Sequence, residues 1–131
     1  MNAWDGVRQV LRARAPIVHD EPASLGFLLG SRRFSIRLDE RAPRMIVVET
    51  TYAYAHRDAG EMMERNRHAP IGALHRAGAH YILRQSLPVD GLTWATFEAA
   101  IRAMGAWADR ARRRPGDAGA MTSLFEGFAT V

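Results

Sequence analysis

The most regular hydrophobic pattern in this chain lies in its last third. From residue 94 onward, apolar side chains recur at steps that alternate between three and four residues. Side chains with this spacing lie above one another on one face of an α-helix. The pattern therefore predicts a long amphipathic helix, with Thr93 as its N-cap. Its apolar face consists of Trp94, Phe97, Ile101, Met104, Ala108 and Ala111.

A second apolar strip runs along the same predicted helix. Trp107 lies off the first face, beside Ala100 and Ala103. Helices that are apolar on more than one side usually bury each of those sides. We expect one strip to pack on the protein's own sheet and the other on a second copy of the chain, as a homodimer.

Alternating patterns ahead of this helix predict a sheet of about five strands. Residues 25–29 and 34–38 alternate on either side of a glycine turn, which is typical of a hairpin. Residues 45–52 begin with the β-branched run expected of a central strand. The remaining strands are expected at residues 71–75 and 80–87.

Two further helices are expected, at about residues 3–15 and at residues 58–67, while residues 19–22 are expected to be a polar connection. The predicted order is helix, three strands, helix, two strands, helix. Strands covered by helices in this order indicate an α+β fold with an antiparallel sheet. We expect residues 1–114 to form this domain and residues 115–131 to form a C-terminal tail.

The predicted tail has two parts. Its first part contains Gly and Pro and is expected to be flexible. Its second part carries apolar residues at helical spacing. We expect Leu124, Phe125 and Phe128 to become helical when they dock on a groove of the domain or of a neighbouring subunit.

Composition narrows the classes of function. The chain has 131 residues, of which 47% are apolar, and it contains no Cys, which excludes disulfides, thiolate metal sites and Cys nucleophiles. No apolar stretch is long enough to span a membrane, and the N-terminal residues lack the apolar core of a signal peptide. These features predict a soluble, cytoplasmic protein.

The basic charge leaves two interpretations open. The formal net charge is +4, and all 18 basic residues are Arg. Most are interspersed with acidic residues. The one run, Arg110 with Arg112, Arg113 and Arg114, ends the long helix, where cations complement the helix dipole. The alternative is that an Arg-rich surface binds nucleic acid through its phosphates.

Candidate catalytic groups do not form a set with suitable spacing. Four histidines could be imagined as metal ligands, but they lack known zinc spacings and have no Cys beside them: His56, His68, His75 and His80. The chain has no Gly-x-Ser-x-Gly elbow and no Lys for a phosphate-binding P-loop. We expect no catalytic residue, no metal site and no cofactor. An enzyme centred on the histidines ranks last among the hypotheses.

Several local features together resemble a known group of proteins. They are the strand Tyr81–Arg84, the corner Leu87–Leu92, the closing helix, and Asn66 at the end of the second predicted helix. With the order of elements, they resemble the YbjN and type III secretion chaperone-like superfamily, which includes the CesT/Tir-type chaperones. The resemblance covers about residues 3–114.

The resemblance implies a small, non-enzymatic α+β domain that is usually a homodimer. The dimer would form through the long helix or through the second helix around Met62 and Met63. In the secretion chaperones, an effector segment wraps over apolar patches on the sheet and the first helix. Here the residues expected to supply such a groove are Trp4, Val7, Leu11, Phe27, Leu29, Phe34 and Ile36.

These observations predict a chaperone or adaptor that binds an extended segment of a partner protein. The secretion chaperones are commonly acidic, whereas this chain is basic. That departure leaves room for the YbjN-like branch, whose members resemble regulatory or adaptor domains. Nucleic-acid binding remains the alternative function.

Overall fold

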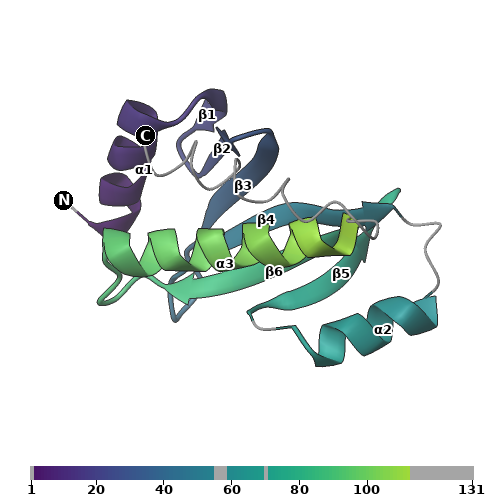
Figure 1. Ribbon diagram of the computed structural model, residues 1–131. Helices are drawn as coiled ribbons and strands as arrows, with labels where there is room; N and C mark the ends of the chain where they lie inside the picture. The colour runs from purple at the N-terminus through teal and green to yellow at the C-terminus, as the bar shows by residue number, and fades with distance from the viewer. Residues whose placement is uncertain (1, 55–58, 70, 113–131) are drawn as a thin grey trace.

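The computed structural model describes residues 2–54, 59–69 and 71–112. Three helices and six strands follow one another along the chain (Figure 1). They are α1 (Ala3–Arg14), β1 (Ile17–Glu21), β2 (Ser24–Leu29), β3 (Arg32–Asp39), β4 (Met45–Tyr54), α2 (Ala59–Arg67), β5 (Ala73–Ala77), β6 (His80–Pro88) and α3 (Trp94–Arg112).

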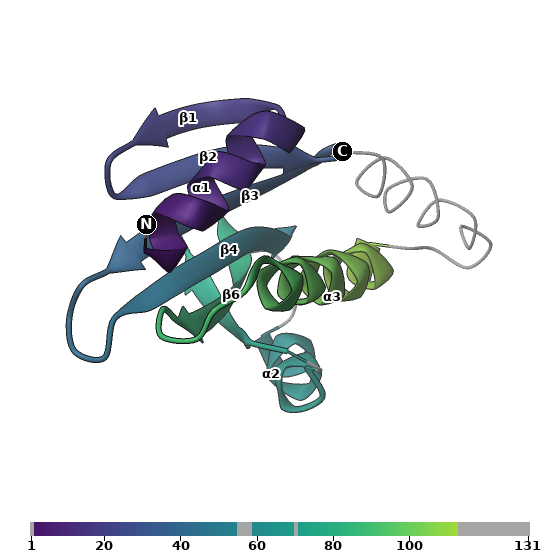
Figure 2. The ribbon, with the colours of Figure 1, turned by 90° about the vertical axis from the view of Figure 1, so that its left-hand side faces the viewer.

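The strands form one antiparallel sheet in the order β1-β2-β3-β4-β6-β5 (Figure 2). The β2–β3 hairpin turns at Gly30, whose φ of 62° lies in the left-handed region that glycine adopts without strain. The α+β class and the antiparallel sheet predicted from the sequence are therefore confirmed. The order leaves β1 and β5 as the two edges of the sheet.

The prediction of a polar connection at residues 19–22 is wrong. Residues 17–21 form β1, a sixth strand, which pairs with β2 through His19↔Gly26, Asp20↔Leu25 and Glu21↔Ser24. The polar sequence forms a strand because its backbone pairs with β2. The carboxylate of Asp20 is neutralised by arginines of α1, as described below.

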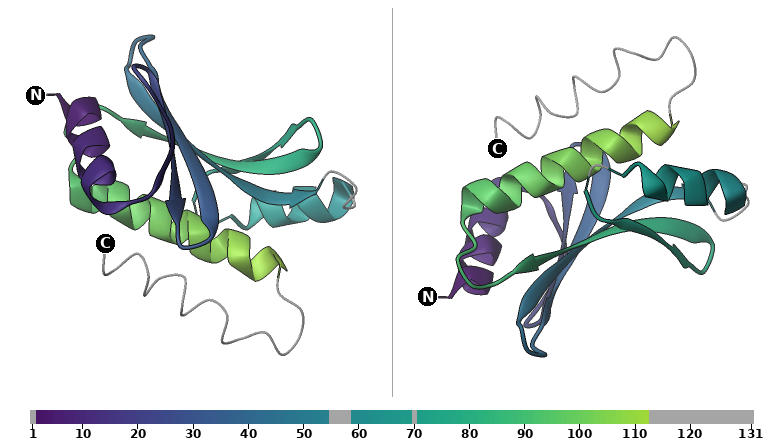
Figure 3. Two further views of the ribbon diagram at one scale, coloured as in Figure 1. Left: turned by 90° about the horizontal axis from the view of Figure 1, so that it is seen from above. Right: turned by 90° about the horizontal axis from the view of Figure 1, so that it is seen from below.

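All three helices lie on one face of the sheet (Figure 3). On that face, α1 buries Trp4, Val7 and Leu11, and α2 buries Met62. The core continues through the inward-facing side chains of the strands and the buried face of α3. The described residues leave the opposite face of the sheet uncovered.

The helix ends follow the local sequence. Asn2 caps α1 by accepting a hydrogen bond from the backbone N–H of Asp5 at 2.8 Å. At α3, the backbone N–H of Thr96 donates to the Thr93 hydroxyl at 3.2 Å, as expected of an N-cap. Within the described ranges, none of the helices combines the length and hydropathy needed to cross a membrane.

A buried arginine joins α3 to the centre of the sheet. Arg32, at the start of β3, is only 6% exposed. Its guanidinium donates to the carboxylate of Asp109 on α3, and to the carbonyl of Thr51 on β4 at 2.7 Å. A buried guanidinium needs such partners because its desolvation is costly. The long helix is thereby fixed along the sheet.

Candidate functional site

The edge strand β1 exposes apolar side chains next to an unpaired backbone. On one side β1 pairs with β2, and among the described strands none pairs with its other side. Ile17 is 36% exposed and Val18 is 43% exposed; only Met63 joins them as an exposed large apolar residue in the described part of the chain. An exposed apolar edge is a template for pairing with another strand.

Helix α1 holds this edge strand in place through Asp20. The Arg12 guanidinium donates two hydrogen bonds of 2.7 Å to the Asp20 carboxylate, and Arg8 donates a third at 3.1 Å. Hydrogen bonding by Arg12 lowers the pKa of Asp20 to about 2. Asp20 is therefore ionised at neutral pH.

The turn after β1 is also attached to α1. The indole Nε1 of Trp4 donates to the carbonyl of Pro22 at 3.2 Å, and Arg8 donates to the carbonyls of Glu21 and Pro22. Together with the Asp20 pairs, these bonds fix the position of β1 relative to the core.

On the face of the sheet away from the helices, the ring of His19 packs over Gly26 of β2. A Cβ placed on Gly26 would lie 2.4 Å from Nδ1 of His19. The imidazole therefore covers the space that a side chain at position 26 would occupy. Only glycine fits beneath the ring without displacing it.

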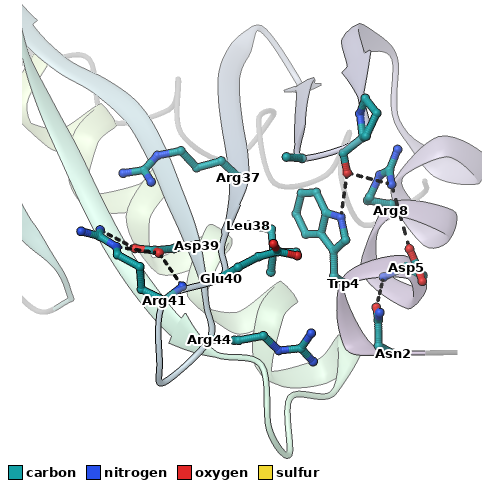
Figure 4. A pocket seen from close by; sticks show the side chains of 12 residues that line it. Asn2, Trp4, Asp5, Arg8, Arg37, Leu38, Asp39, Glu40, Arg41 and Arg44 are labelled. Atoms are coloured by element: carbon teal, nitrogen blue, oxygen red, sulfur yellow. Dashed lines mark hydrogen bonds and ion pairs between the residues drawn. The ribbon is translucent and has the colours of Figure 1, made fainter.

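A polar pocket of about 630 Å³ opens at the end of the sheet beyond this turn (Figure 4). Trp4 and Leu38 lie between Arg8 on the α1 side and the Asp39–Arg41 pair on the β3–β4 side. Arg41 donates to Asp39 at 2.7 Å and lowers the pKa of that carboxyl to about 2. An ionised carboxylate that is already paired is unsuited to act as a general acid.

The residues predicted to form a partner groove lie in the core instead. Each is at most 4% exposed, because the inward face of the sheet is covered by α1 and α3: Trp4, Val7, Leu11, Phe27, Leu29, Phe34 and Ile36. Their alternation marks the buried face of the strands. The structure places all seven in the core, and of them only Trp4 also lines the pocket at the end of the sheet.

The helix residues named from the sequence also pack within the chain. Phe97, Ile101 and Met104 are fully buried. Trp94 and Trp107 are half-buried against the core, and the Trp107 ring lies 4.6 Å from that of Tyr52. The second strip of α3 thus has a partner within the same chain.

The remaining candidates are the two methionines of α2, the apolar residues of the predicted tail, and His56. Met62 is 2% exposed, whereas Met63 is 71% exposed on α2. Residues 113–131, with Leu124, Phe125 and Phe128, lie outside the described residues, as does His56.

No metal centre is formed within the described ranges, where no three His, Asp or Glu side chains meet in a suitable group. Nη1 of Arg67 lies 2.9 Å from the Glu64 carboxylate, which also contacts His68 at 3.0 Å. His75 lies on the exposed edge strand β5.

The arginines do not form a single basic surface. On the helix-covered side, Arg8 and Arg12 pair with Asp20, Arg65 pairs with Glu61, and Arg67 pairs with Glu64. Of the predicted run, Arg110 is exposed, Arg112 ends α3, and Arg113 and Arg114 lie outside the described residues. Pairing with carboxylates reduces the field available to attract phosphates.

Comparisons with known proteins support the fold. No protein-family model matches the chain, and no curated protein matches it. A chain from the solved structure of the HopA1-SchA chaperone-effector complex is similar, with a TM-score of 0.64 and 14% sequence identity. The match covers 82% of this chain and 88% of that chain. This similarity shows that the two chains share a fold, and this fold is the α+β architecture expected from the sequence.

Proposed function

We propose that this protein is a non-enzymatic chaperone or adaptor that binds an extended segment of a partner protein. The segment adds as a further strand to β1, in the manner of β-augmentation. The observation that carries this proposal is the β1 edge, where Ile17 and Val18 are exposed beside backbone groups that no other described strand pairs with.

Two kinds of interaction would stabilise the added strand. Backbone hydrogen bonds give affinity, while the side chains of Ile17 and Val18 offer apolar area for the partner to bury. The hydrogen bonds from α1 hold β1 in position before the partner arrives. An edge that is already ordered loses less conformational freedom on binding.

The fold supports a protein partner. The structurally similar chain belongs to a complex of a chaperone with an effector. The pocket beside the edge offers paired ions and a buried Trp side chain, and its lining residues include no Ser, Thr, Tyr or His. No specific observation favours nucleic acid, so we propose protein binding alone.

Site-specific crosslinking tests the proposal. The full chain, carrying a photo-crosslinking amino acid in place of Val18, would be expressed in its own host and irradiated. The matched control carries the same group in place of Arg76, on the other edge strand. We expect one partner protein to crosslink at position 18 and not at position 76. Equal crosslinking at both positions, or none at position 18, would contradict the proposal.

We also propose that the protein is a homodimer that uses α2. The side chain of Met63 is 71% exposed on that helix and is available for contact with a second copy. Sedimentation of the full chain should give a dimer, and Met63→Ser should shift the equilibrium toward monomer. A monomer at all concentrations would contradict the dimer proposal and leave the β1 proposal unaffected.

A further inference from the structure

The face of the sheet opposite the helices carries side chains that the proposed strand addition does not use. None of the three helices covers this face (Figure 3). Strand pairing places on it a row formed by Ser35, Glu49 and Arg84, and a second row with Thr51 and Ile82. Arg33 lies opposite Leu28 on the same face, because its neighbours Arg32 and Phe34 point into the core.

A hollow of about 340 Å³ lies between these rows. Ile82 and Ala77 are its apolar lining residues, and Thr51 lies beside them. Arg33 and Glu49 lie among its polar lining residues. The hollow therefore combines apolar and charged lining residues, which suits an apolar side chain that has a charged neighbour.

The charge that this face offers to a partner is positive. Glu49 is engaged by two arginines, since Nη2 of Arg84 lies 2.9 Å and Nε of Arg37 lies 3.6 Å from its carboxylate. Of the other carboxylates near this face, Asp39 pairs with Arg41, whereas Glu21, which ends β1, accepts only from the neutral hydroxyl of Ser24. Arg33 is exposed, and it makes no ion pair within the described part of the chain.

We propose that this face binds a second segment of a protein partner, one that is acidic and amphipathic. An apolar side chain of that segment fills the hollow, and an adjacent Asp or Glu pairs with Arg33. This inference extends the proposed protein-binding role to a different surface, and it does not require strand addition at β1.

A second copy fits the face less well, because docking it symmetrically would bring the arginines of this face against themselves. Single-stranded nucleic acid would compete with an acidic segment for the same arginines, and competition by single-stranded DNA separates the two.

Peptide selection tests the proposal. A random peptide library would be selected on the immobilised full chain, and the Kd of the recovered peptides would be measured. We expect the peptides to carry Asp or Glu beside an apolar residue. Arg33→Glu should weaken their binding by about tenfold or more, and Arg33→Gln by less, because it only removes the charge. Binding should also weaken as salt is raised.

A matched control separates charge at this face from charge in general. Arg110→Glu makes the same change of charge on α3, on the other side of the sheet, and should leave the Kd unchanged. Val18→Asp should also leave it unchanged. Peptides that lose binding with Val18→Asp and not with Arg33→Glu would overturn this proposal while supporting the one for β1.

Further results would also overturn it. One is recovery of peptides without acidic residues. Another is displacement of the acidic peptides by single-stranded DNA, which would assign the face to nucleic acid. A third is binding only after removal of residues 113–131, which would assign the face to a segment of the chain itself.

Discussion

The two edges of the sheet differ in whether a helix side chain bonds to a free backbone group and in which side chains they expose. At β5, the side chain of Asn66 on α2 accepts a hydrogen bond of 2.8 Å from the backbone N–H of Leu74. The same edge strand exposes Arg76, and charged edge residues discourage pairing with other strands. At β1, Asp20 and Glu21 are exposed as well, but the strand begins with two exposed apolar residues, Ile17 and Val18.

This difference indicates which edge is available to a partner. The β5 edge is protected by a helix side chain, whereas α1 holds β1 from the inward side and none of the described residues covers its outer side. An edge that is fixed but uncovered is the arrangement expected of a strand-binding site. Four predictions test this contrast.

The largest expected effect concerns the helix that supports β1. Leu11 of α1 is fully buried, so Leu11→Ala should lower the free energy of unfolding by about 3 kcal/mol. Leu74→Ala on the half-buried β5 strand should cost about 1 kcal/mol, because less apolar area is lost. Urea denaturation measures both values. Equal losses would mean that the two edges are supported to the same extent.

The next effect concerns binding. Replacing Ile17 and Val18 together by Ser should weaken partner binding by about tenfold, because about 1.4 kcal/mol of apolar contact is removed. Their partial exposure means that the free energy of unfolding should change by about 0.5 kcal/mol or less. The Kd for the crosslinked partner segment is the measurement. The proposed site would be incorrect if the double variant bound as tightly as the unchanged protein.

A smaller effect is expected at the protected edge. Asn66→Ala removes the acceptor for the Leu74 N–H and should cost about 0.5–1 kcal/mol of unfolding free energy. Asn66→Asp keeps an oxygen acceptor and serves as the control. If the alanine variant were as stable as the aspartate variant, this hydrogen bond would not contribute to protecting β5.

The smallest effect depends on pH. The pKa of Asp20 is lowered from 3.8 to about 2 in the folded protein, chiefly by hydrogen bonds from Arg12. The stabilisation from this ion pair should therefore be complete above pH 3.8 and disappear as the pH falls through about 2. The difference in unfolding free energy between the unchanged protein and Asp20→Asn should follow that course.

Asp39 provides the control for this prediction. Its pKa is also lowered to about 2, by Arg41, at a position away from β1. Asp39→Asn should show the same pH window without any change in partner binding. A constant stability difference for Asp20→Asn down to the lowest pH would contradict the role given to the Arg12 pair.

Hydrophobic periodicity predicted the buried parts of this fold well. The spacing of Phe97, Ile101 and Met104 located α3 and its buried face, and alternation located β2 and β3. Periodicity reports which side chains face the core. For the same reason, the groove predicted from this periodicity consists of core residues such as Phe27 and Phe34, which are both fully buried.

The open edge could not be predicted in the same way. Residues 17–21 show no alternation, and Asp20 suits a strand only because Arg8 and Arg12 reach it from α1. Those contacts depend on the tertiary arrangement. The protection of Leu74 by Asn66 likewise joins residues that meet only when α2 packs beside β5.

Hydrogen exchange of the full chain, with and without the partner identified by crosslinking, tests the central claim most directly. Strand addition at β1 predicts slower exchange of the backbone amides of residues 17–21 in the complex, with no change at residues 73–77. Slower exchange at residues 73–77 without any change at residues 17–21 would contradict it.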